Sequence, residues 1–553
     1  MPLFTLQRVA TPHCCHRWLR WFAALFVACL GAHAQAQLRE DQVLVVYDSR
    51  IVDSLAVAEY YAGSPKVPGG AGALHGIRPG VRVMDLAATS QPAMGIPDID
   101  YATFTSRLRD PIRAHLTATD PTDIVRCIVL TKGIPHRILD QTSPTVGDEP
   151  WNLEAPFNAG NLTYASVDSE LVLLWQTLND GANGQSQGSR AAGIIINPYW
   201  RASQPISKLD RPNLHTQKSL QPLYSPPAGI LWRTLPTGPA LTAGDMYLVC
   251  RLDADTVAGV RTIIDRAQTR YVDMNTGAII LDETASNGVA DTTPVNSPEF
   301  DNQDFGDTVG DSYLWGGDDY EQTRNLATTD GRWTPGKIYY DGLSGAANYI
   351  LGPRLSYTEG IFVSDPVVLL TSEANNANVH GTVPGGGSAG PQLVNTLFWA
   401  PMGVCNTLES YNARALGGLD RRFNQTKIGE ALASGVTFFI GDVWEPYSST
   451  IPDSLQLLSH FFLGDMCWAE AAYTALPAIS WQAVVVGDPL ARVQRSSEDI
   501  DADQRVTIDD AYRWEVVRTD INRSGSGNNT DRQIIERSLR AGEFQDLRGT
   551  QRP

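Results

Sequence analysis

The strongest constraint on the fold is a series of short, continuous runs of apolar and β-branched residues, each followed by polar turn residues. Val43–Tyr47 is one such run, and Val52–Tyr61 after it has apolar residues at helical spacing. Runs that are apolar at every position are typical of strands buried on both faces of a parallel sheet. The alternation continues through Val81–Met84, Phe104–Leu116 and Ile124–Leu130. It predicts an α/β fold with helices on both faces of a layered, mostly parallel sheet.

The same alternation returns towards the end of the main body. Gly435–Gly441 predicts a buried strand, with helices at Ile428–Ala433 and Leu455–Leu463 on either side of it, and Trp481–Leu490 predicts a final strand and turn. Pro111 is expected to kink the helix that contains it. With about 100–200 residues per domain, a chain of 553 residues predicts two to four folded units.

Polar residues follow two of the predicted strands directly. Asp48 and Ser49 come after the first strand, and Thr131 and Lys132 come after the third. Ligands of open α/β sheets bind outside the carboxyl ends of the strands. These four residues are therefore predicted either to border a binding crevice or to act only as turn residues.

The first 36 residues have the pattern of a secretory signal peptide. They carry no acid before an apolar run at Trp21–Leu30, and small residues follow at positions 32–36. The run of ten residues is too short to cross ~30 Å of hydrocarbon, and no later segment approaches the required length. We expect cleavage after Ala34 or Ala36 and a secreted protein without a membrane span in its mature form. The positive residues of the segment are Arg8, Arg17 and Arg20.

Charge and cysteine content narrow the function further. The net charge of −18 argues against a nucleic-acid-binding protein, which needs a basic surface to neutralise phosphates. Four cysteines remain after the signal peptide, too few for a disulfide scaffold in a chain of this length. Cys127 and Cys250 lie in strand-like runs and are expected to be buried. Pairing of Cys405 with Cys467 is left open.

Several separated stretches together resemble a family of large, secreted bacterial α/β proteins whose activity is not established. The resemblance implies one domain family across most of residues 40–490 and supplies no catalytic residue. We expect the main body to span residues 37–495, with 37–200 and 240–495 as candidate sub-units. The stretches are Val43–Asp48 with Ser54–Tyr61, Ile128–Pro135, Ser166–Leu171, Tyr247–Asp253 with Ile264–Ala267, Gly435–Tyr447 and Ser480–Leu490.

The C-terminal half of this region also resembles caspase- and gingipain-like cysteine peptidases. Those enzymes place a His-Gly pair after one strand and a Cys after the next. His380 follows Val367–Leu370, and Cys405 follows Leu397–Met402. The resemblance implies that His380 deprotonates Cys405 for nucleophilic attack. The alternative is a loop histidine and a buried thiol.

Two pairs of carboxylates suit glycoside hydrolysis, which needs two acids about 5–9.5 Å apart. The pairs are Asp442 with Glu445 and Asp168 with Glu170. Such pairs also arise by chance in a chain with 61 acids. If the main body is an enzyme, the sequence therefore points to a hydrolase, either a peptidase or a glycoside hydrolase.

Two acidic loops of twelve residues, Asp499–Asp510 and Asp520–Asp531, follow one another 21 positions apart. Oxygen-bearing residues recur at loop positions 1, 3, 5, 7, 9 and 12, the positions that supply Ca²⁺ ligands in calcium loops. Position 7 contributes its backbone carbonyl. The predicted ligands are Asp499, Asp501, Asp503, Arg505, Thr507 and Asp510 in the first loop, and Asp520, Asn522, Ser524, Ser526, Asn528 and Asp531 in the second.

Asp rather than Glu at position 12, and a single helix after each loop, make residues 497–545 similar to a dockerin, and we assign residues 496–553 to this module. The predicted helices are Ala511–Arg518 and Arg532–Leu539. The resemblance implies a small all-α module that binds two Ca²⁺ ions and docks to a cohesin-type partner. The second site is expected to be weaker, because Ser524 replaces a charged ligand. The positions implied to contact cohesin are Ile508, Asp509, Asn529 and Thr530.

These inferences predict a secreted calcium-binding protein that docks to a cohesin-type partner in an extracellular complex. Dockerin-bearing proteins often belong to polysaccharide-degrading complexes, which makes extracellular polysaccharide or protein the expected ligand of the main body. The alternative function is a cysteine peptidase that uses His380 and Cys405.

Overall fold

The computed structural model describes most of the chain after the predicted signal peptide. The predicted peptide itself lies outside the described residues. The described residues are 38–70, 72–89, 91–95, 97–139, 163–178, 195–209, 219–220, 241–274, 276–282, 320–330, 333–341, 350–354, 361–372, 393–407, 411–414, 416, 428–444, 450–464, 466–494, 498–501, 507–521 and 526–540.

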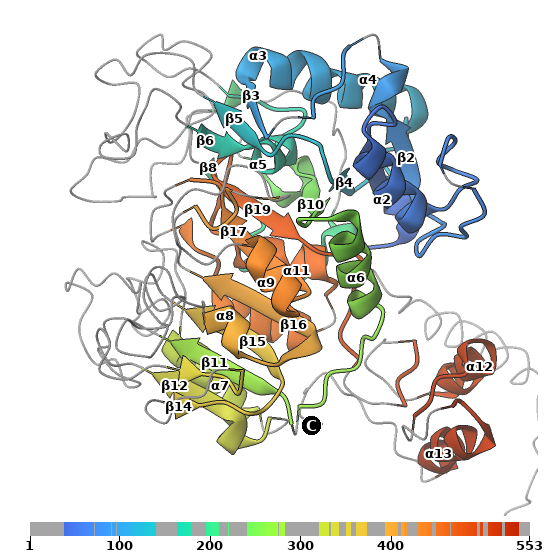
Figure 1. The fold of residues 1–553 in the computed structure, drawn as a ribbon, viewed down its shortest axis with the longest axis vertical. Helices are drawn as coiled ribbons and strands as arrows, with labels where there is room; N and C mark the ends of the chain where they lie inside the picture. Colours follow the sequence, from blue (N-terminus) through green and yellow to red (C-terminus); the bar gives the residue numbers. More distant parts are fainter. Residues whose placement is uncertain are drawn as a thin grey trace, which may run out of the picture. The chain divides into compact units, whose positions relative to one another are not determined.

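A ten-stranded sheet forms the centre of the main body (Figure 1). Eight of its nine strand pairings are parallel, which confirms the predicted α/β class with a mostly parallel sheet. In spatial order the strands are β12 (Ile338–Asp341), β11 (Ala278–Asp282), β15 (Val367–Ser372), β16 (Trp399–Thr407), β17 (Phe438–Asp442), β19 (Ala483–Val486), β10 (Leu248–Leu252), β4 (Cys127–Thr131), β1 (Val43–Tyr47) and β2 (Arg82–Asp85).

The one antiparallel pairing joins β17 to β19 and divides the sheet into two half-sheets. We call β2, β1, β4, β10 and β19 the first half-sheet, and β12, β11, β15, β16 and β17 the second. Strands are parallel within each half and opposed between the halves. The carboxyl ends of the two halves therefore lie at opposite edges of the sheet.

The continuous apolar runs form the central strands because both faces of the sheet are covered. Every residue of β1, β4 and β10 is buried, as expected for strands packed between two helical layers. The two candidate sub-units, 37–200 and 240–495, are separated before β10. Because β10 pairs with β4, the first half-sheet contains strands from both of them.

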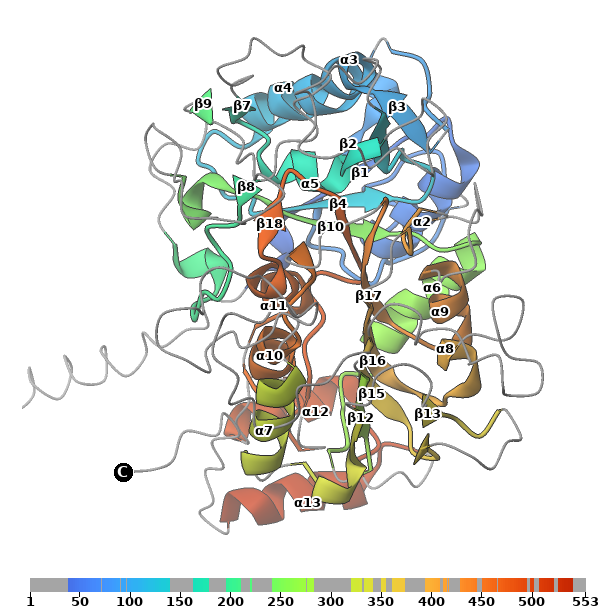
Figure 2. The same ribbon diagram turned by 90° about the vertical axis from the view of Figure 1, so that its left-hand side faces the viewer.

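Helices cover both faces of the second half-sheet (Figure 2). One layer contains α7 (Tyr320–Thr329), α10 (Ser454–Gln456) with the π-helix η10 (Leu457–Phe462), and α11 (Trp468–Ala475). The other contains α6 (Val257–Ala267), α8 (Leu393–Thr396) and α9 (Ile428–Ser434). Around the first half-sheet lie α2 (Val52–Ala62) and α5 (Val167–Val172).

The predicted helix around Pro111 consists of three segments. It runs as α3 (Tyr101–Phe104), the π-helix η3 (Thr105–Arg109) and α4 (Asp110–Thr119). Pro111 is the second residue of α4 and follows the π-helix almost directly. The irregularity therefore precedes the proline, and the backbone continues in a helical conformation up to it.

Short strands and 3₁₀ turns complete the main body. The small sheets pair β3 (Asp98–Asp100), β5 (Arg137–Leu139) and β6 (Thr163–Ser166); β8 (Ile195–Ile196) and β18 (Ala478–Ile479); β7 (Thr177–Leu178) and β9 (Ser219–Leu220); and β13 (Ile350–Leu351) and β14 (Ile361–Phe362). The 3₁₀ turns are η1 (Glu40–Gln42), η2 (Leu86–Ala88), η5 (Ile206–Lys208), η6 (Ala243–Asp245) and η7 (Pro335–Lys337).

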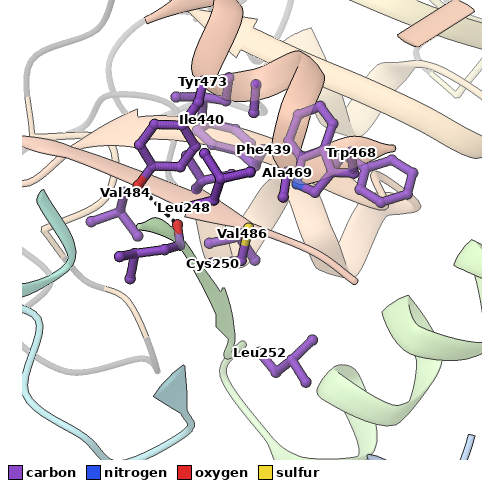
Figure 3. Packing of buried hydrophobic residues seen from close by; sticks show 14 of the residues in the cluster. Leu248, Cys250, Leu252, Phe439, Ile440, Trp468, Ala469, Tyr473, Val484 and Val486 are labelled. Carbon is purple, nitrogen blue, oxygen red and sulfur yellow. Dashed lines mark hydrogen bonds between the residues drawn. The ribbon is translucent and has the colours of Figure 1, made fainter. Parts of the chain in front are cut away.

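Apolar side chains from both half-sheets meet where β19 joins them (Figure 3). Leu248 of β10, Ile440 of β17 and Val486 of β19 belong to the same buried cluster as Trp468 of α11. Tyr473 of α11 donates a hydrogen bond of 3.0 Å to the Val249 carbonyl. The junction is therefore a single continuous core.

A buried carboxylate directly after β19 connects this strand to three other parts of the chain. Asp488 accepts hydrogen bonds from Tyr61 (2.6 Å), Arg78 (2.6 Å) and Gln268 (2.9 Å), and it forms an ion pair with Arg78. Burial alone would raise the pKa of Asp488, but the Arg78 guanidinium and the other donors lower it below its usual value.

The predicted C-terminal module contains two helices, α12 (Ile508–Val517) and α13 (Asn529–Arg540), which pack against each other. Its core consists of Ile500, Trp514, Ile521 and Ile535. These residues form two pairs with the 21-residue spacing of the loops, Ile500 with Ile521 and Trp514 with Ile535. The sequence repeat is thus also a repeat of the packing.

Among the described residues, no helix has the length and apolar character needed to cross a membrane.

Replacing Asp488 by Asn should lower the free energy of unfolding by about 3–5 kcal/mol, because Arg78 would remain buried without its counter-charge. Urea denaturation measures this change. Asp41→Asn is the control, because it removes only an exposed ion pair with Arg39 and should cost at most about 1 kcal/mol.

The lowered pKa of Asp488 also fixes the sign of its pH dependence. Its stabilisation is present above the ordinary range of a carboxyl group and is lost as the pH falls through the folded-state pKa. The difference in stability between wild type and Asp488→Asn should therefore shrink in strong acid. Equal stability of the two proteins at neutral pH would contradict this account.

Candidate functional site

Three carboxylates of the first predicted calcium loop come together. Asp499, Asp501 and Asp510 each place one oxygen within 4.8 Å of the others. Two ligands at 2.3–2.6 Å on opposite sides of a Ca²⁺ ion are separated by about this distance. Loop positions 1, 3 and 12 are therefore arranged as ligands of one cation.

The start of α12 holds Asp510 in place. Thr507 caps the helix, and its N–H donates to Asp510 Oδ2 at 2.6 Å. The N–H of Ile500 donates to Asp510 Oδ1 at 2.6 Å. The pKa of Asp510 is raised to about 6, mainly by burial and also by the nearby carboxylate of Asp501, while these backbone donors oppose the rise. A bound cation would offset the cost of burial and the repulsion from Asp501, both of which disfavour the ionised form of Asp510.

The second loop repeats this geometry at its carboxyl end. The N–H of Asn528 donates to Asp531 Oδ2 at 2.8 Å, as Thr507 does to Asp510. The Asn528 side chain accepts from Thr530 N–H at 2.9 Å, as the Thr507 side chain does from Asp509. Loop positions 9 and 12 thus have the same local structure in both loops.

The other predicted ligands are only partly described. Asp520 and Ser526 are described, and both have interactions within the structure. Asp503, Arg505, Asn522 and Ser524 lie outside the described residues. The second, weaker calcium site therefore remains a prediction.

A close contact between helix α12 and the second loop requires glycine. A Cβ atom at Gly527 would lie 1.7 Å from the carbonyl oxygen of Arg518. Arg518 itself ends α12 in the left-handed region, at φ 53°. Glycine at position 527 therefore has a packing reason.

An apolar stripe is exposed along α12. Ile508, Tyr512 and Val516, spaced four residues apart, are 56%, 69% and 74% exposed. This spacing places the three side chains on one face of the helix. The corresponding positions of α13, 21 residues later, are Asn529, Gln533 and Arg537. The apolar stripe of α12 is therefore not repeated at the equivalent positions of α13.

Side chains at the carboxyl edge of the first half-sheet are satisfied by the protein itself. Arg50 binds Asp48 through two nitrogens, at 2.7 and 2.8 Å. The hydroxyls of Ser54 and Thr131 share a hydrogen bond of 2.7 Å. Lys132 donates to the Ala254 carbonyl at 2.7 Å and lies 3.4 Å from Asp253. The N–H of Ser49 donates to Asp85 at 3.0 Å. Each predicted crevice residue is therefore held by another residue of the protein.

One of the two carboxylate pairs also has structural partners. Asp168 forms a buried ion pair of 2.6 Å with Arg251, and Glu170 accepts a hydrogen bond from Ser480. In the other pair, Asp442 is described and Glu445 lies outside the described residues.

Cys405 lies inside β16, two residues before the strand ends. It pairs with Leu370 on β15 and Phe439 on β17, and its side chain is fully buried. His380 lies outside the described residues, so the peptidase dyad remains a prediction. Cys405 and Cys467 do not form a disulfide, and Cys127 and Cys250 are buried as predicted.

Unmatched polar groups lie at the carboxyl edge of the second half-sheet. Asp442 is buried at the end of β17, where burial raises its pKa to about 7. The hydroxyl of Thr371 and the side-chain carbonyl of Asn406 are buried and have no hydrogen-bond partner among the described residues. Sequence reasoning missed Thr371 and Asn406, although each is a polar residue near the end of an apolar run.

Comparisons with known proteins add little to these observations. No known family model matches the chain. No curated protein matches it. A solved structure titled "Structure of Protease" aligns with a TM-score of 0.34 and 8% sequence identity, covering 85% of this chain and 82% of that chain.

Replacing Asp510 by Asn should weaken calcium binding by more than the ~100-fold that loss of an outer-shell partner already costs. The change removes a ligand charge while preserving the shape of the side chain. Calorimetric titration of the full chain measures the affinity of the first site.

The matched control is Asp509→Asn, because Asp509 is an exposed neighbour outside the carboxylate cluster. Calcium affinity equal to wild type is expected for this control. If Asp510→Asn also binds like wild type, the cluster is not a calcium site.

Proposed function

We propose that this protein is a secreted, calcium-dependent docking protein. Its C-terminal module, residues 496–553, would bind Ca²⁺ and attach the main body to a cohesin-type partner in an extracellular complex. The observation that carries the proposal is the convergence of Asp499, Asp501 and Asp510 beside a helix that exposes an apolar stripe.

Calcium would act by ordering the module. Asp499 and Asp510 are fully buried, and buried carboxylates at this separation repel one another. A divalent cation cancels that repulsion, so binding free energy becomes folding free energy. The small core around Trp514 supplies little apolar burial by itself, which makes the module dependent on the ion.

The docking surface in this proposal is the apolar stripe of α12, formed by Ile508, Tyr512 and Val516. Large apolar side chains are rarely this exposed in a row unless they contact a partner. The stripe begins two residues before Asp510, so calcium and the docking surface share the first turn of one helix. Loss of calcium would therefore disorder the surface and release the partner.

The main body would be the cargo of this attachment. We propose extracellular polysaccharide as its target class. This part of the proposal rests on the association of dockerin-like modules with polysaccharide-degrading complexes.

Replacing Tyr512 by Ala should weaken binding to a cohesin-type domain by about 30-fold, the loss expected for a central interface aromatic worth about 2 kcal/mol. A panel of purified cohesin-type domains, titrated with the full chain by calorimetry, measures this effect. Binding should disappear when calcium is chelated.

Gln533→Ala is the matched control, because Gln533 is exposed at the equivalent position of α13. It should bind like wild type. The docking proposal fails if no cohesin-type domain binds, if binding survives chelation, or if Tyr512→Ala and Gln533→Ala have equal effects.

A further inference from the structure

The two half-sheets share one strand order. The first has its second strand, β2, outside its first, β1, followed by β4 and β10. The second repeats this arrangement with β12, β11, β15 and β16. In such sheets the order in which successive strands are added reverses between the first and third strands, and ligands bind at the carboxyl ends beside that switch point. The main body therefore has two topologically equivalent candidate edges, one in each half.

The equivalent residues of the two edges differ in their hydrogen bonding. In the first half, Thr131 ends β4, and its hydroxyl contacts Ser54 at 2.7 Å and the Val46 carbonyl at 3.2 Å. In the second half, Thr371 occupies the same place near the end of β15, and no described residue forms a hydrogen bond with its buried hydroxyl. One edge is closed by protein contacts, and the other retains hydrogen-bonding capacity.

Two further polar groups lie on the same face as Thr371. Asn406 is the register partner of both Thr371 and Ile440, so these side chains share a face of the sheet. Asp442 is two residues beyond Ile440 and therefore points to that face as well. The Asn406 amide donates to the Pro452 carbonyl at 2.9 Å. Pro452 lies two residues before α10, so the three side chains are on the face of the sheet that this segment covers. We call Thr371, Asn406 and Asp442 the polar row.

The polar row lowers the stability of the folded chain. The Thr371 hydroxyl and the Asn406 carbonyl are both buried away from water, and the described residues supply no compensating hydrogen bond. The described residues also provide no hydrogen-bond donor to the Asp442 carboxyl, and burial is the one cause of its raised pKa. In a natural protein, buried polar groups without hydrogen-bond partners are expected at functional sites.

The chemistry of the row limits the ligand. No described cationic side chain acts on Asp442, so an anionic ligand would lack a counter-charge. Thr371 and Asp442 lie two strand spacings and two residues apart, about 11 Å between Cα atoms, which is too far for one metal ion to bridge. A peptide ligand would pair with an unpaired edge strand. The polar row does not suit a peptide, because it lies on β15, β16 and β17 in the interior of the sheet.

We propose that the polar row of Thr371, Asn406 and Asp442 is a binding site for a neutral saccharide. The hydroxyl groups of a saccharide both donate and accept hydrogen bonds. They therefore match the Asn406 carbonyl, the Thr371 hydroxyl and the Asp442 carboxyl group, which is partly protonated at neutral pH. The site lies in the main body and is independent of calcium docking through α12.

The test compares Thr371→Val and Asp442→Asn with wild type in the full mature chain. The probes are neutral di- to hexasaccharides of glucose, xylose, mannose and galactose, titrated by calorimetry in the presence of calcium. Thr262→Val is the control, because Thr262 is exposed on α6. At least one oligosaccharide should bind wild type and the control equally and bind each row variant about tenfold more weakly.

Thermal unfolding of Thr371→Val separates a binding role from a structural one. Valine has the shape of threonine without the unmatched hydroxyl, so this variant should unfold at the same or a higher temperature than wild type. A lower unfolding temperature or failure to fold would mean that the hydroxyl has a structural partner, which overturns the proposal. Absence of binding by every oligosaccharide, or unchanged binding by Thr371→Val, overturns it as well.

Discussion

The architecture of the main body depends on one four-residue strand. β19 is parallel to β10 and antiparallel to β17, so it joins two half-sheets that run in opposite directions. Asp488, directly after this strand, binds Tyr61, Arg78 and Gln268 and thereby links the strand to distant segments. A buried charge of this kind is tolerated because its partner charge and additional donors accompany it.

The opposed halves have a functional consequence, because their carboxyl edges cannot form one shared crevice. The first edge is closed by the Asp48–Arg50 pair and the Ser54–Thr131 hydrogen bond. The second edge retains unmatched polar groups at Thr371 and Asn406. Ligand chemistry in the main body is therefore expected at the second edge, while the calcium loops give the C-terminal module a separate role in attachment.

Local features were predictable from the sequence, whereas long-range relationships were not. Val43–Tyr47 forms β1 as predicted, and the loop spacing correctly grouped Asp499 with Asp510, because both follow from contacts between near neighbours. The direction of β19 was not predictable, since an apolar run looks the same whether its neighbour is parallel or antiparallel. The ion pair between Asp168 and Arg251 joins residues 83 positions apart, a contact that no local pattern encodes.

The most direct test of the docking account is a calcium titration of the full mature chain. The account predicts two ions bound with unequal affinity, because the second loop has a neutral serine where the first has Asp503. The tighter site should change the environment of Trp514 in the near-ultraviolet circular dichroism spectrum. Absence of binding at about 1 mM free calcium, the weak limit for extracellular calcium modules, would contradict the account.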